Sequence, residues 1–193
     1  MSEILEDKID YGPLKYLNGT WKGDKGIDVA PDIDGKDIEP FYETIRFEQL
    51  APMLSNAKKQ FIAPIFYHHR VIKKATNIEF HNQCGYWMWV PADNLIMHTL
   101  TIPRGMAVVA GGYYNGETDK DGNIIIAVES GLDHPDWPVA QSPFLRDNAS
   151  TTKFTYKGTF AELTMKYSET TLLNIYGDKD FQHTDNSTLT KES

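Results

Sequence analysis

Short segments in which apolar and polar residues alternate run through most of this chain of 193 residues. In residues 41–50, every second position from Phe41 to Phe47 carries Phe41, Glu43, Ile45 and Phe47, and polar side chains dominate the positions between them. A repeat of two residues is the pattern of a β-strand with one buried face. Other such segments lie at 19–26, 60–72, 78–90, 95–102, 106–114, 123–130, 151–156, 160–167, 171–176 and 187–191.

Turn signals separate these segments at fairly regular spacing and predict how they connect. Pro91 to Asn94 and Asp119 to Gly122 each indicate a hairpin. We therefore predict an all-β fold: a single antiparallel up-and-down β-barrel of about ten strands with one or two short helices, similar to lipocalins and fatty-acid-binding proteins. The barrel is expected to occupy residues 11–193, after a flexible N-terminal tail at 1–10. A barrel of this size can hold one small ligand inside.

Four segments are expected to depart from the strand pattern. Tyr11 to Leu17 is predicted as a short helix, with Pro13 in its first turn. Gly26 to Pro40 is rich in Gly, Pro and Asp, which predicts a long surface loop that could act as a lid. A second long loop is expected at 133–150. Pro64, inside a strand segment, predicts an edge position or a bulge.

Composition narrows the classes of partner. The chain has 19 basic and 27 acidic residues, a formal net charge of −8, which argues against a nucleic-acid partner. The start of the chain lacks the pattern of a secretory signal and no apolar run has membrane-spanning length, so we expect a soluble protein with no membrane partner. The single cysteine, Cys84, suits a reducing compartment, and we expect a cytoplasmic location. A homodimer is possible.

Four groups of residues, taken in order, resemble the nitrobindin family. They are the stretch Gly19-Thr-Trp-Lys-Gly-Asp-Lys-Gly26, the pair Tyr42-Glu43, the motif Phe80-His-Asn-Gln-Cys-Gly-Tyr86, and His183 near the C-terminus. The resemblance spans residues 14–191. It implies a barrel related in shape to fatty-acid-binding proteins that takes ferric haem, here haem b, on one histidine, which by position is His183. It also implies nitric oxide binding and isomerisation of peroxynitrite to nitrate at the iron.

The chain departs from the family pattern at two of these places. Asp28-Val29-Ala30-Pro31 stands where a tyrosine-proline pair is usual, and Gln83 stands where a glutamate is usual.

Four side chains are candidates for the site, each with an ordinary alternative. His183 is the predicted metal ligand, with Asp185 able to orient its ring; the alternative is an exposed loop histidine. His69 and His98 lie on apolar strand faces and could contact haem or another ligand, or could be hydrogen-bonded core residues. Arg104, at a strand end, could pair with a haem propionate or a fatty-acid carboxylate, or could be a solvated turn arginine.

Glu43 shares a face with Phe41 and Ile45, so its carboxylate needs a partner if buried. Arg104 or a histidine could supply it.

Three hypotheses follow for function. The first is a haem protein, which as an enzyme would be a haem-dependent peroxynitrite isomerase. The second is a metal-free carrier of a fatty acid or a similar hydrophobic ligand. The third is a structural or protein-binding barrel, which would have its interior filled by large side chains.

Overall fold

A computed structural model of the chain describes residues 9–54 and 60–192. The tail predicted at 1–10 lies outside the described residues except for its last two. The described chain is almost entirely β-structure, and its three short helices are η1 (Gly12–Leu14), η2 (Pro91–Asp93) and α1 (Pro143–Asn148). No helix among the described residues has the length and apolar character needed to cross a membrane.

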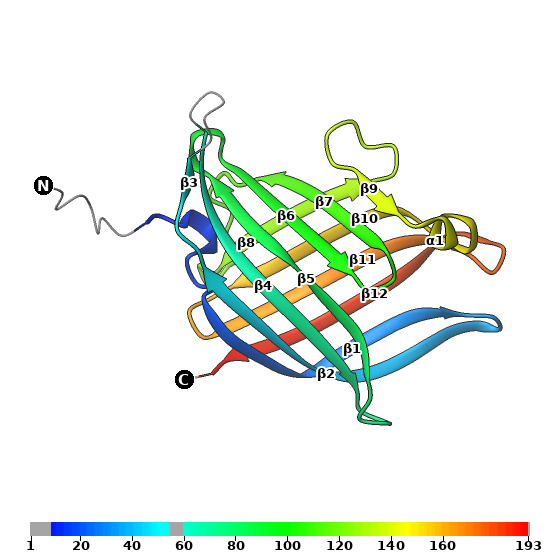
Figure 1. The fold of residues 1–193 in the computed structure, drawn as a ribbon. Helices are drawn as coiled ribbons and strands as arrows, with labels where there is room; N and C mark the ends of the chain where they lie inside the picture. The colour runs from blue at the N-terminus through cyan, green and yellow to red at the C-terminus, as the bar shows by residue number, and fades with distance from the viewer. Residues whose placement is uncertain (1–8, 55–59, 193) are drawn as a thin grey trace, which may run out of the picture.

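Ten long strands form the wall of a closed barrel (Figure 1). They are β1 (Gly19–Asp32), β2 (Gly35–Gln49), β4 (Phe61–Lys73), β5 (Glu79–Val90), β6 (Leu95–Ile102), β7 (Met106–Tyr113), β8 (Ile124–Gly131), β10 (Ala149–Phe160), β11 (Thr164–Ile175) and β12 (Asp178–Lys191). Two short strands, β3 (Met53–Leu54) and β9 (Val139–Gln141), pair with β4 and β7.

The barrel strands follow one another around the ring in the order of the chain, and each pairs antiparallel with its neighbours. Two ladders close the ring, because β1 pairs with β12 and β2 pairs with β4. The predicted all-β, up-and-down barrel is therefore confirmed. The predicted inward faces are confirmed as well: Phe41, Glu43, Ile45 and Phe47 are all buried.

The barrel interior is filled at only one end. Helix η1 lies at this end, together with the last residues of β12 (Figure 1). Apolar side chains close it: Leu14, Trp21, Phe160 and Leu189 are each at most 1% exposed. The indole Nε1 of Trp21 donates to the carbonyl of Leu17, which fixes η1 over the barrel end. At the opposite end the interior contains a cavity.

The segment predicted as a loop and lid at 26–40 is instead a hairpin, so that prediction is wrong. β1 and β2 stay paired from Gly26 and Phe41 to Asp32 and Gly35, and only two residues form the turn. The hairpin extends beyond the barrel wall at the end remote from η1 (Figure 1). Gly, Pro and Asp suggested a loop, but the backbone of this segment stays extended and supplies the cross-strand hydrogen bonds of the ladder.

Three smaller predictions also need correction. The helix expected at 11–17 is a single 3-10 turn, and the loop expected at 133–150 contains β9 and α1, which begins after the capping residue Ser142. The strands expected at 160–167 and 171–176 belong mainly to one strand, β11. Polar residues hid this continuity from the pattern.

The pairing of β4 explains how the strand accommodates Pro64, for which an edge position or a bulge is predicted. Pro64 lies where β4 passes from its partner β2, which ends opposite Ile65, to β3, which begins opposite Ile62.

The glycine of the 80–86 motif provides a test of the fold. A Cβ at Gly85 would lie 1.9 Å from the Thr99 carbonyl oxygen of β6, whereas one at Gly131 would be no closer than 3.4 Å to any heavy atom. We expect Gly85→Ala to lower the free energy of unfolding by about 1–3 kcal/mol, the usual cost of overpacking, as measured by urea denaturation. Gly131→Ala is the matched control. Equal stability of the two variants would contradict the prediction.

Candidate functional site

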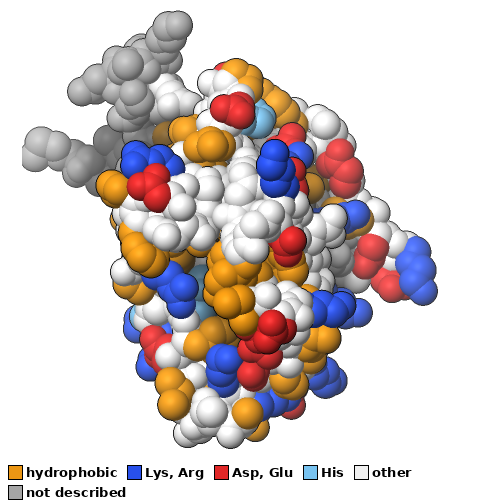
Figure 2. Space-filling view, turned by 90° about the vertical axis from the view of Figure 1, so that its right-hand side faces the viewer, with side chains coloured by type: hydrophobic (Ala, Val, Ile, Leu, Met, Phe, Trp, Pro, Cys, Tyr) orange, Lys and Arg blue, Asp and Glu red, His pale blue; other side chains and the backbone are white. Residues whose placement is uncertain are grey.

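A cavity of about 310 Å³ opens at the barrel end remote from η1. Eight of the barrel strands and α1 contribute to its lining. Pro31 of β1, Arg104 of the β6–β7 turn and Tyr176 of the β11–β12 turn lie among the lining residues. Figure 2 looks onto this end of the molecule, where apolar, basic and acidic side chains lie close together.

One wall of the cavity is apolar. It is formed by β6, β7, β10 and α1 through Leu100, Ile102, Met106, Phe154 and Leu145. These strands carry the two-residue apolar repeat, which directs every second side chain inward. This wall suits a hydrophobic ligand.

The opposite wall is acidic. In the ring, β6 stands five places from β12, and β12 is flanked by β1 and β11. Asp185 of β12 is directly paired with Asp28 of β1 on one side and with Glu169 of β11 on the other. All three side chains line the cavity. Like charges placed directly opposite each other on neighbouring strands repel, so this row is costly unless a positive group neutralises it.

His183 lies in the same wall, two residues before Asp185. Its Nε2 is 2.8 Å from Oδ1 of Asp28 and 3.8 Å from Oδ2 of Asp185. Burial opposes protonation of His183, but the hydrogen bond to Asp28 and the charges of Asp185 and Glu169 outweigh it and raise the pKa of the imidazole. One ligand atom each from Asp28, His183 and Asp185 lie within 4.8 Å of one another.

The two other carboxyl groups of this wall have perturbed pKa values. Burial, reinforced by the charge of Asp185, raises the pKa of Glu169 from 4.5 to about 8. Burial raises the pKa of Asp185 to about 6, although the neighbouring His183 partly offsets the effect. Perturbed pKa values gathered in a cleft are typical of functional sites.

The cavity floor contains the partner that Glu43 requires. Oε2 of Glu43 accepts hydrogen bonds of 2.8 Å from Nε2 of His69 and from the hydroxyl of Tyr167. His69 and Tyr167 line the cavity, while the Glu43 side chain is fully buried behind them. The partner is therefore a histidine from the neighbouring strand β4 rather than Arg104.

His98 is a buried core residue that does not line the cavity. Its ring stacks on Trp87 at 4.0 Å between centroids, and its Nε2 lies 3.0 Å from the Tyr67 hydroxyl. Burial lowers the pKa of His98 to about 3, so the ring is neutral. Trp87 and Tyr67 thus surround the ring of His98, as expected for a hydrogen-bonded core residue.

The structure thus brings together His183, His69 and Arg104, of which Arg104 is exposed at the cavity mouth. Their roles toward a ligand stay predictions. Sequence reasoning missed Asp28 and Glu169 as site residues. Asp28 fell within the supposed loop, and Glu169 lies in the polar stretch between two strands predicted separately. Continuing the alternation from Met165 and Tyr167 would have placed Glu169 inward. The same procedure would have placed Asp28 outward, because a bulge between Gly23 and Gly26 shifts the inward face of β1 by one residue.

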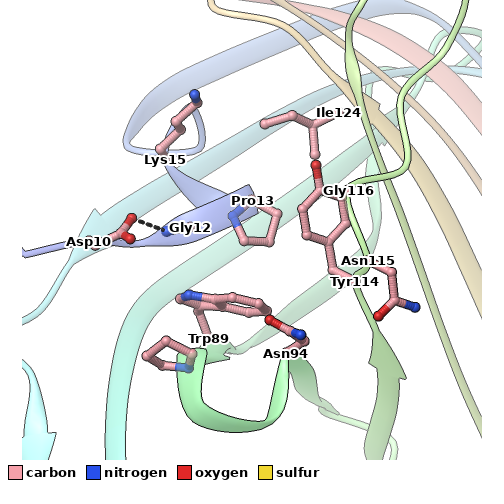
Figure 3. A pocket seen from close by; sticks show the side chains of 11 residues that line it. Asp10, Gly12, Pro13, Lys15, Trp89, Asn94, Tyr114, Asn115, Gly116 and Ile124 are labelled. Atoms are coloured by element: carbon pink, nitrogen blue, oxygen red, sulfur yellow. Dashed lines mark hydrogen bonds between the residues drawn. The ribbon is translucent and has the colours of Figure 1, made fainter.

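A second hollow lies at the opposite end, outside the barrel interior (Figure 3). It is a wider surface groove of about 760 Å³ between η1, η2 and the end of β7, lined among others by Lys15, Trp89 and Tyr114. Only Asp10 and Lys15 are charged among its lining residues, and they form no cluster. The inner cavity, with its converging polar groups, is the better candidate for a ligand site.

Comparison with known proteins identifies the family. The family model described as "THAP4-like, heme-binding beta-barrel domain" matches residues 10–191. This chain belongs to that family. The result confirms the resemblance to nitrobindins. No curated protein matches the chain.

A solved structure, Rv2717c from M. tuberculosis, is similar to this THAP4-like domain in fold. The TM-score is 0.68 at 16% sequence identity, over 95% of this chain and 100% of that one. At this identity the likeness extends to the fold alone.

The acidic wall predicts a distinctive dependence of stability on pH. Because the pKa of Glu169 is about 8 in the folded chain and 4.5 ordinarily, its contribution to stability is fully present below pH 4.5 and is lost as the pH rises to about 8. Glutamine does not titrate. We therefore expect Glu169→Gln to gain thermal stability relative to the parent chain between pH 4.5 and pH 8, measured in a chelating buffer.

The exposed Glu162, in the turn after β10, provides the control. Glu162→Gln should follow the parent chain at every pH. A constant difference between Glu169→Gln and the parent chain across the range would contradict the assignment.

Proposed function

We propose that the inner cavity binds haem b, with His183 as the iron ligand, and that the bound haem handles nitric oxide or peroxynitrite. The family supports haem binding in general. The observation that carries the assignment to this cavity is His183 itself: an imidazole that lines the hollow and is held by a carboxylate from another strand.

The residues of the cavity fit this group. Histidines that bind metals commonly donate their other ring N–H to a carboxylate, which fixes the ring and raises its basicity. Asp28 is such a carboxylate, and its side chain is 6% exposed. The second ring nitrogen of His183 has no protein hydrogen-bond partner among the described residues.

Haem iron, when bound, supplies the coordination and redox chemistry toward nitrogen oxides that the resemblance implies. The chain's own residues supply position and environment. Leu100, Ile102 and Phe154 form an apolar wall that would exclude water from a bound macrocycle. Arg104, exposed at the mouth, would pair with a propionate of the bound haem. His69 presents a ring that Glu43 holds in place on the cavity floor.

A fatty-acid carrier is the weaker candidate. Arg104 offers a positive charge at the mouth, but the interior wall carries Asp28, Glu169 and Asp185. A carboxylate drawn into this cavity would meet those groups, and like charges in a water-poor site repel strongly. A ligand that keeps its carboxylates at the mouth avoids this repulsion, as haem can.

Absorbance spectroscopy tests the proposal. Titration of the purified, metal-free chain with haemin is expected to shift the Soret band with a stoichiometry of one haem per chain. His183→Ala should abolish the shift, because the proposed iron ligand is then missing. Asp28→Asn should weaken haemin binding by about 10- to 100-fold, the usual effect of losing the carboxylate that orients a ligating histidine.

His68→Ala provides the matched control, because His68 lies on the outer face of β4, where it contacts Asn82. This variant should bind haemin like the parent chain. A parent chain without a shifted Soret band, or a His183→Ala variant with an unchanged one, would refute the proposal. Mixing the haem-loaded chain with peroxynitrite and following its decay then tests the reaction.

A further inference from the structure

The donor groups around His183 exceed what a haem iron requires. One imidazole is sufficient to hold haem from one side. Here Nε2 of that imidazole faces two carboxylates, Asp28 at 2.8 Å and Asp185 at 3.8 Å. Glu169 stands next in the same row, directly paired with Asp185. Two of these groups come from β12 and one each from β1 and β11, so the barrel wall holds the set together.

The spacing of the donor atoms suits a single small ion. Ligand atoms bound to one first-row metal ion lie about 2.0–2.3 Å from it, so they stand roughly 3 to 4 Å apart. The Nε2 and Oδ atoms of Asp28, His183 and Asp185 lie within 4.8 Å of one another. Small side-chain rotations would bring all three onto a common ion without any shift of the strands.

The charge of this wall also calls for a cation. Asp28 and Asp185 form ion pairs with His183 alone within the part of the chain that the structure describes, and Glu169 forms none. A single imidazole supplies at most one positive charge to the carboxylates of Asp28 and Asp185. The Asp28 side chain is only 6% exposed. A buried carboxylate lowers stability unless its charge is fully compensated. A divalent cation would supply the missing charge.

We propose that Asp28, His183 and Asp185 form a site for a divalent transition-metal ion that binds directly to the protein, without a porphyrin. One nitrogen and two oxygen donors favour ions such as Zn²⁺, Mn²⁺, Fe²⁺ or Co²⁺ over Mg²⁺ and Ca²⁺, which prefer oxygen alone. Three protein ligands leave coordination positions that face the cavity. Glu169 lies beside these positions and can accept a hydrogen bond from a water molecule on the ion.

This inference concerns the same cavity as the proposed function but does not depend on it. Nε2 of His183 cannot bind the ion and keep the hydrogen bond to Asp28 that orients the ring in the proposed haem site. The two occupants therefore compete, and a chain loaded with the divalent ion should take up haemin more slowly and more weakly.

Cobalt binding tests the site, because Co²⁺ held by nitrogen and oxygen ligands has visible absorption bands that report its coordination. The chain is stripped with a chelator, dialysed and titrated with Co²⁺, followed by absorbance and calorimetry. We expect one ion per chain, with an affinity reduced at least about tenfold in Asp185→Asn and lost in His183→Ala. Asp178→Asn, exposed at the start of the same strand, is the matched control and should bind Co²⁺ like the parent chain.

Circular dichroism establishes that each variant is folded before its titration is interpreted. Absence of stoichiometric Co²⁺ binding by the parent chain, or equal binding by Asp185→Asn and the parent chain, would overturn the inference. Haemin titration of the same samples separates the two proposals. A parent chain that binds haemin but no Co²⁺ rejects the ion site and keeps the haem site, and the reverse result rejects the haem site and keeps the ion site.

Discussion

The ladder between β2 and β4 is the constraint on which the rest of the molecule depends. It pairs residues 41–49 with 65–73 and joins the two free edges of an otherwise open sheet. Closure removes the edges at which a long sheet would aggregate, and it gives every strand one inward face. The same ladder places Glu43 beside β4, where His69 reaches it. The ladder that closes the barrel thus also forms the floor of the cavity.

The two ends of the barrel interior differ: one is packed with apolar side chains, and the other contains the cavity. Large apolar side chains around Trp21 and Phe160 fill the end covered by η1 and supply most of the hydrophobic core. Polar residues accumulate toward the open end, first as the Glu43 and His69 pair and then as the acidic wall with His183. Repulsion within that wall costs stability, which is the common condition of a site that a ligand completes. An apolar wall faces it, so the cavity offers a ligand both a hydrophobic surface and donor atoms.

The alternating pattern predicted the strands well wherever one face is apolar. It placed His69 and His98 inward, and both are buried. The same pattern could not distinguish their surroundings, because depth along the barrel axis depends on which strands become neighbours. His98 is enclosed by Trp87 and Tyr67, while His69 reaches the cavity. Local composition misled the prediction at 26–40, where glycine and proline indicate a loop although the ladder of β1 and β2 continues.

The sequence by itself determined the fold class and the inward faces of most strands, because these depend on local periodicity. His183 was a candidate through the family resemblance alone. Only the tertiary structure decided what surrounds His183. Asp28 and His183 are 155 positions apart, and Glu169 belongs to a third strand. Their proximity follows from ring closure and strand register, which are set by contacts distant in sequence and leave no mark in any single segment.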